Sequence, residues 1–180
     1  SPEINIDPTI AGSVVGTYWF LMMIGRLCGA SIGAKVSSRA MLTVVSTVGI
    51  ALVLGAIFCA DNILVNMPVF KSDISFGFAQ VPVNVMLLIL CGLCTSVMWG
   101  GIFNLAVEGL GKYTAAASGL FMVMVCGGGI LPLIQGGVAD FAGFLNSYWV
   151  IALGLAYILF YAAIGSKNVN TDIPTDDYEA

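Results

Sequence analysis

The chain contains five long apolar stretches, and this feature constrains its fold more than any other. They cover residues 10–34, 41–60, 83–107, 114–139 and 147–164. A transmembrane helix needs roughly 20 apolar residues, whereas a membrane-spanning strand needs apolar and polar residues in alternation, which these stretches lack. The sequence therefore predicts an all-α integral membrane protein, with a bundle of about five transmembrane helices in residues 1–165.

The composition supports this class and excludes several others. Only 9% of the 180 residues are charged and 59% are hydrophobic, whereas a soluble domain carries about 25% charged residues. The net charge of −4 gives no basic surface for nucleic acid. The chain has no histidine and shows no paired acids, so we predict that it is not an enzyme. Cys91 and Cys94 have the spacing of a metal or redox motif, but we interpret them as packing residues and expect no metal or cofactor.

The basic residues predict the orientation in the membrane, because lysine and arginine near the ends of spans stay cytoplasmic. Only Lys71, in the polar 61–82 connection, falls on the opposite side from the others, which are Arg26, Lys35, Arg39, Lys112 and Lys167. We therefore expect an external N-terminus, an external 61–82 loop and an acidic cytoplasmic tail at 166–180. The expected location is the cytoplasmic (inner) membrane of a cell.

Small residues recur at intervals of four in two of the predicted helices. One series is Gly25, Gly29 and Gly33; the other is Gly92, Ser96 and Gly100, with Asn104 next in line. Small residues let transmembrane helices approach closely. We predict that both series are contact surfaces, which either slide during conformational change or pack statically.

The fourth stretch contains Pro132 after three consecutive glycines. Proline cannot donate a hydrogen bond to the residue four positions earlier, here Gly128, and its ring crowds that carbonyl. We expect a bend or unwound turn at this point. Transporters use such broken helices at substrate sites and hinges, although a purely structural kink is the alternative.

Arg26 is the one charge placed well within a predicted span. An unpaired charge at that depth is costly, so we expect it to pair with a carboxylate, with Glu108 as the partner within this chain. Alternatively, the long side chain extends to the lipid phosphates.

The motifs resemble those of a known family. The first two stretches and their basic link, from Gly25-Arg26 through Lys35 to Arg39, resemble the cytoplasmic motif of the major facilitator superfamily between its eighth and ninth helices. Segments 98–103 (Met-Trp-Gly-Gly-Ile-Phe) and 108–114 (Glu-Gly-Leu-Gly-Lys-Tyr-Thr) resemble the tenth helix and following loop of the fucose/glucose/galactose proton symporters. The glycine run with Pro132 resembles their eleventh helix. Gly100 and Gly101 replace the proline and threonine of that family.

This resemblance implies helices eight to twelve of a twelve-helix transporter. The missing N-terminal half would then complete the protein, and the proton-coupling acids would lie in it. The expected function is secondary active transport of a monosaccharide, of fucose or hexose type, coupled to protons and working by alternating access. Sugars bind aromatic faces, amides and hydroxyls, so the candidate substrate-binding residues are Trp99, Asn104 and Gln135.

The candidate conformational or gating residues form a second set: Gly25, Arg26, Gly29, Glu108, Gly128 and Pro132. The expected partners of the chain are the sugar, the proton, the lipid bilayer and the missing half. Two alternatives stay open, which are a transporter of another small solute in the same superfamily and a membrane scaffold subunit that transports nothing.

Overall fold

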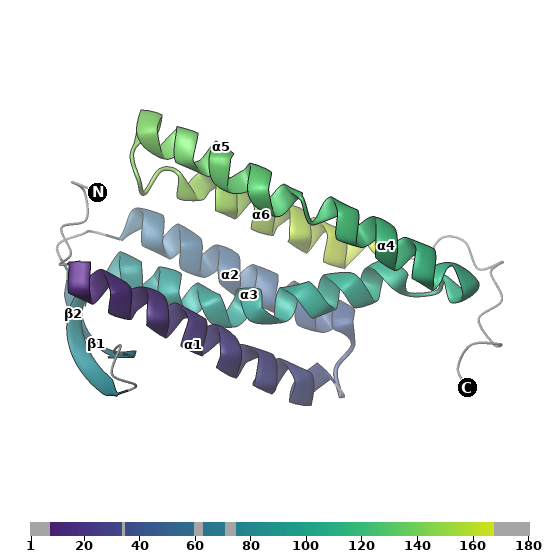
Figure 1. Ribbon diagram of the computed structural model, residues 1–180, viewed down its shortest axis with the longest axis horizontal. Helices are drawn as coiled ribbons and strands as arrows, with labels where there is room; N and C mark the ends of the chain where they lie inside the picture. Colours follow the sequence, from purple (N-terminus) through teal and green to yellow (C-terminus); the bar gives the residue numbers. More distant parts are fainter. Residues whose placement is uncertain (1–7, 34, 60–62, 71–74, 168–180) are drawn as a thin grey trace.

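A computed structural model describes residues 8–33, 35–59, 63–70 and 75–167, shown as ribbons in Figure 1. The helices are α1 (Pro8–Gly33), α2 (Ser38–Phe58), α3 (Val83–Val107), α4 (Thr114–Met124), α5 (Gly127–Ala142) and α6 (Tyr148–Phe160). A short 3₁₀ turn (Gly111–Tyr113) precedes α4, and a π-helical turn (Tyr161–Gly165) extends α6. Two strands, β1 (Leu64–Phe70) and β2 (Phe76–Pro82), lie between α2 and α3.

Five helical stretches of the described chain are long and apolar enough to cross a membrane. They are Ile10–Gly33, Ser38–Phe58, Val83–Val107, Gly111–Ala142 and Tyr148–Gly165. The expected all-α membrane architecture is therefore confirmed. The fourth stretch is longer at both ends than the predicted 114–139, and the predicted tail lies outside the described residues from 168 onward.

Helix α3 forms the centre of the bundle. It packs against α1 on one side and α2 on the other, and α6 packs against the far side of α2. Helices α4 and α5 run beside α6 in Figure 1. The largest buried cluster joins α2, α3 and α6 and includes Leu42, Val53, Met98 and Leu155.

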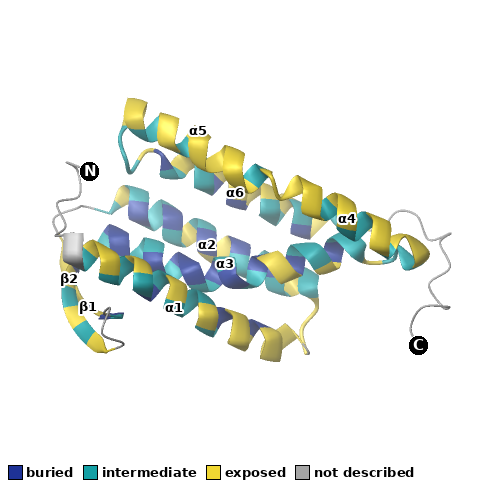
Figure 2. Ribbon diagram, viewed as in Figure 1, coloured by how far each residue is buried: buried dark blue, intermediate teal, exposed yellow. Residues whose placement is uncertain are grey.

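Helices α4 and α5 are almost uncovered. None of their described residues is buried, and Figure 2 shows them mostly in the colour of exposed residues. Because their residues are strongly apolar, the exposed faces suit lipid or further transmembrane helices.

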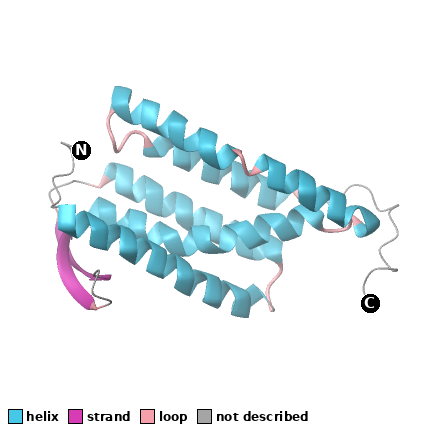
Figure 3. Cartoon of the chain, in the orientation of Figure 1, coloured by secondary structure: helices cyan, strands magenta, loops and turns pink. Residues whose placement is uncertain are grey.

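The connection between α2 and α3, expected as an external loop, is a β-hairpin. Figure 3 shows the two strands at one end of the helical bundle. They pair in antiparallel register, with Leu64 opposite Pro82 and Phe70 opposite Phe76. Val69 and Val81 are fully buried and pack with Ile10 of α1, so tertiary contacts stabilise a hairpin that would be marginal alone.

The connections alternate between the two ends of the bundle. The turn before α2 and the Gly111–Tyr113 turn lie at one end, whereas the hairpin and the α5–α6 connection lie at the other (Figure 1). Arg39 and Lys112 are therefore at the same end. This arrangement fits the clustering of positive charge used above, although which end is cytoplasmic stays a prediction.

Candidate functional site

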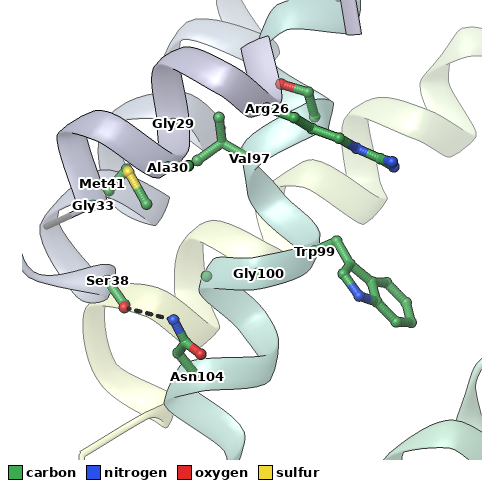
Figure 4. A pocket seen from close by; sticks show the side chains of 12 residues that line it. Arg26, Gly29, Ala30, Gly33, Ser38, Met41, Val97, Trp99, Gly100 and Asn104 are labelled. Carbon is green, nitrogen blue, oxygen red and sulfur yellow. Dashed lines mark hydrogen bonds between the residues drawn. The ribbon is translucent and has the colours of Figure 1, made fainter. Parts of the chain in front are cut away.

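A first cavity lies between α1, α2 and α3 and has a volume of about 570 Å³. Glycine and alanine residues of α1 form one wall, and Trp99, Gly100 and Asn104 of α3 form the opposite wall (Figure 4). No atom lies within 4 Å of the position that a Cβ at Gly100 would take. The absence of a side chain at Gly100 therefore helps to keep this cavity open between α1 and α3.

Trp99 lies at the rim of this cavity. Its indole is 47% exposed and points away from Ser38 and Asn104 in Figure 4. It contacts Phe121 of α4 edge-to-face, with ring centroids 5.4 Å apart, and Phe121 makes a second such contact with Phe103. An exposed indole held by a second ring can offer its face and its N–H to a ligand.

Asn104 contacts another helix. Its Nδ2 donates a hydrogen bond to Ser38 Oγ over 3.5 Å, at the limit of such contacts, and so connects α3 to the start of α2. The side chain is exposed and also lines a neighbouring polar cleft with Arg39 and Glu108. The amide is therefore available to a solute at this end of the bundle.

Gln135 lies in a different cavity from Trp99 and Asn104. This second cavity, of about 580 Å³, is formed mainly by α1, α3, α5 and α6. Its polar lining residues are Tyr18, Thr95, Gln135 and Tyr148, and the hydroxyls of Tyr18 and Thr95 lie 3.3 Å apart. The structure therefore does not bring the three predicted sugar-binding residues together in one cavity.

Sequence reasoning missed Tyr18, Thr95 and Tyr148. Thr95 could have been found from the sequence, because residues four apart share a helical face and Thr95 precedes Trp99 by four positions. Trp99 and Thr95 therefore lie on one stripe of α3. Trp99 lines the first cavity and Thr95 lines the second. Tyr18 and Tyr148 carried no such pattern, since their positions depend on how α1 and α6 are rotated.

Gly25, Gly29 and Gly92 lie where α1 and α3 touch, as expected, whereas Gly100 of the same series borders open space. A Cβ at Gly25 would overlap Ser96 Oγ, and a Cβ at Gly29 would lie 2.8 Å from a methyl carbon of Val97. At Gly92, the added carbon would lie 2.9 Å from the Tyr18 ring. These positions therefore keep α1 and α3 in close contact, and whether they slide remains a prediction.

The expected ion pair between Arg26 and Glu108 is not formed. In the described part of the chain no salt bridge joins Arg26 to a carboxylate, and its guanidinium lies 3.9 Å from the Met22 sulfur. Glu108 lines the polar cleft at the end of α3, whereas Arg26 lines the first cavity. Arg39 in turn donates a hydrogen bond to the Ser166 carbonyl over 3.0 Å, and so connects α2 to the end of α6.

The expected break in the fourth transmembrane stretch lies between α4 and α5. Helix α4 ends at Met124 and α5 begins at Gly127. The backbone bonds through the break connect residues three apart, as in Gly128 N to Val125 O at 2.8 Å, which is the tighter 3₁₀ pattern. Pro132 lies inside α5. The glycine run weakens the helix at this point, and Pro132 removes a further backbone bond, to Gly128, within the first turns of α5.

Comparisons with known proteins identify relatives over most of the chain. It is 30% identical over 169 residues to a glucose/galactose transporter of Brucella abortus, covering 90% of this chain and 36% of the relative. A putative glucose/galactose transporter of Helicobacter pylori is also 30% identical, covering 91% of this chain and 37% of the relative. The L-fucose-proton symporter of Escherichia coli is 33% identical over 92 residues, which are 51% of this chain and 21% of that protein.

The chain belongs to the fucose/glucose/galactose symporter family of the major facilitator superfamily. It spans little more than a third of the length of the two glucose/galactose transporters. These relatives are named as transporters and not as enzymes. No protein-family model matches the chain, and no solved structure matches it either.

Proposed function

We propose that this chain is the C-terminal part of a proton-coupled monosaccharide transporter in the cytoplasmic membrane. The observation that carries the proposal is the identity of 30% to glucose/galactose transporters over 90% of the chain. Five membrane-length helices and two cavities along α3 are what one wall of a transport pathway requires. The remaining part of the transporter would supply the opposite wall and the proton-coupling acids.

The proposed sugar path follows the stripe of α3 that carries Thr95 and Trp99. Trp99 would stack on a pyranose ring, and Asn104 would bond its hydroxyls at one end of the path. Gln135 would do the same in the second cavity, with the Tyr18 and Thr95 hydroxyls beside it. These groups match sugar chemistry, since each hydroxyl of a sugar both donates and accepts hydrogen bonds.

The proposed mechanism is alternating access, in which two halves rock around a central site. The close contact of Gly25 and Gly29 with α3 would let these helices move as one body. The break between Met124 and Gly127, next to Gly128 and ahead of Pro132, would let α4 and α5 bend separately. Arg26 and Glu108 are proposed to act separately at the cytoplasmic end, where the polar cleft next to Glu108 would open or close.

The function is tested by uptake into liposomes that contain the full transporter. We expect labelled glucose, galactose or fucose to accumulate when a proton gradient is imposed, and an uncoupler to abolish the accumulation. Uptake that persists with the uncoupler would contradict proton coupling. A full transporter that moves none of these sugars under any gradient would contradict sugar transport.

A further inference from the structure

The β1–β2 hairpin lies at one end of the bundle, against the side of α1. The backbone N–H of Phe70 donates a hydrogen bond to Thr17 Oγ1 over 2.8 Å, and the Phe70 ring stacks on Phe20 with centroids 5.4 Å apart. Both partners belong to α1. The other end of the hairpin, at Pro82, adjoins the first residue of α3. The strands therefore run from the start of α3 down the side of α1.

The length of α1 fixes how deep this contact lies. Its 26 residues make a helix about 39 Å long, and Thr17, nine residues after Pro8, is roughly 14 Å along it. The hydrocarbon core is about 30 Å thick, so at most roughly 9 Å of α1 extends beyond it on this side. An α1 that crosses the whole hydrocarbon core therefore places the contact of Thr17 with Phe70 on the hydrocarbon side of the boundary.

Strand edges at this depth cannot face lipid. Each backbone N–H or C=O without a partner in hydrocarbon costs several kcal/mol, so non-helical backbone occurs there only against protein or water. Within the described residues, β1 and β2 form a two-stranded sheet that pairs with no third strand. The bond from Phe70 to Thr17 covers one of the groups at the edge. The remaining edges need protein or water beside them.

The hairpin face that carries Phe78 contacts α1 at its Phe70–Phe76 end, where both rings pack on Phe20, and its remaining part favours protein over water. Phe78 is 78% exposed there, and Leu64 and Pro68 are exposed beside it. Covering such an apolar side chain is stabilising because it removes apolar surface from water, and a water-filled cavity does not provide this. Asn66 and Gln80 lie opposite each other on the same face. Their amides need hydrogen-bonding partners in a low-dielectric setting.

We propose that this hairpin face, with Phe78 at its centre, is an interface with the rest of the same transporter. The relatives are nearly three times as long as the matched segment, which covers 36% of them, so enough chain exists to form the partner. The partner surface would be an apolar transmembrane helix that also carries polar groups, and these would hydrogen-bond the amides of Asn66 and Gln80. The proposal rests on the proposed function only in requiring that the chain is part of a larger transporter.

The test uses the full transporter in phosphatidylethanolamine–phosphatidylglycerol liposomes, with its native cysteines replaced. A nitroxide label is attached to Phe78→Cys, and its accessibility to oxygen and to a water-soluble nickel chelate is measured by power saturation. Leu153→Cys on α6, exposed and outside every cavity described, is the apolar reference, and Lys112→Cys is the aqueous control. We expect the label at 78 to be at least threefold less accessible to either reagent than the matching control.

Oxygen accessibility equal to that at position 153 would show a lipid-facing hairpin and overturn the proposal. Nickel accessibility equal to that at position 112 would show an aqueous cavity and also overturn it. If Phe78→Cys does not fold, Pro68→Cys, directly opposite in the sheet, is read by the same criteria. Sugar uptake by the unlabelled protein is measured separately, so a failure of the proposed function is distinguished from a failure of the interface.

Discussion

Trp99 combines exposure with support, which is unusual for a residue that only packs. Its indole is nearly half exposed and its edge contact with Phe121 fixes it relative to α4. Such an aromatic pair contributes about 0.5–1.5 kcal/mol beyond the area that it buries. The ring is therefore pre-positioned for a flat ligand surface.

We predict that Trp99→Ala in the full transporter weakens sugar binding at least tenfold, or roughly 1.4 kcal/mol. Trp99→Phe should lose less, because it keeps the stacking face and removes only the indole N–H. Binding and thermal stability are measured on the same purified variants. Trp149→Ala is the matched control, because Trp149 packs edge-to-face on Phe58 and lies outside both cavities. If Trp99→Ala lowered stability and left affinity unchanged, Trp99 would be a packing residue.

The residue scale also shows where prediction from sequence fails. The candidate Trp99 was found from its motif, but its separation from Gln135 was not foreseen. In a soluble helix the polar face reveals which residues point inward. In α3 and α6 the apolar residues are spread around the whole helix, so the sequence does not indicate their rotation. The cavity that holds Gln135 was therefore only visible once α1, α5 and α6 were placed.

At the scale of elements, the contact of α1 with α3 depends on the absence of side chains at particular glycines. We predict that Gly25→Ala lowers the stability of the transporter by about 1–3 kcal/mol, the usual cost of overpacking, because its Cβ would overlap Ser96 Oγ and approach the Leu93 carbonyl. Gly12→Ala on the same helix meets no atom within 4 Å and should be neutral or stabilising. Equal melting temperatures for the two variants would refute the close contact.

The break between α4 and α5 leads to a second prediction at this scale. Pro132→Ala restores a backbone donor that can bond the Gly128 carbonyl, so α4 and α5 should straighten towards one helix. We expect slower sugar uptake together with unchanged or higher thermal stability. Distances between spin labels at Leu120 and Asp140, measured by pulsed EPR, should lengthen. Unchanged uptake in a straightened helix would mean that the break is only a structural kink.

The helices were predictable and the hairpin was not, for physical reasons. Lipid requires long apolar helices, so the length and composition of each run were sufficient to identify it. The 61–82 segment has Pro68 in one strand and Gly77 in the other, residues that argue against strands in sequence. Its strands are stabilised by burial of Val69 and Val81 against α1 and α3, contacts between segments distant in sequence.

At the scale of the whole molecule, the topology gives the next prediction. Because basic residues favour the cytoplasm, the end of the bundle with Arg39 and Lys112 should be inside the cell. In intact cells, a cysteine in place of Lys112 should resist a membrane-impermeant thiol reagent. A cysteine in place of Asn146, exposed in the connection between α5 and α6, should react. The cysteine-free transporter is the background, and the reverse pattern would contradict the proposed orientation.

The last prediction concerns what these 180 residues do alone. Alternating access needs two bodies that close on either side of a site, and here the two cavities along α3 have walls from a single body. Helices α4 and α5 and the outer face of the hairpin are also uncovered in the described chain. Reconstituted alone, the chain should therefore show no sugar uptake above that of empty liposomes under a proton gradient, whereas the full transporter in matched liposomes should accumulate sugar. Robust uptake by the isolated chain, abolished by Trp99→Ala, would show that it forms a complete pathway, for instance by pairing with a second copy of itself.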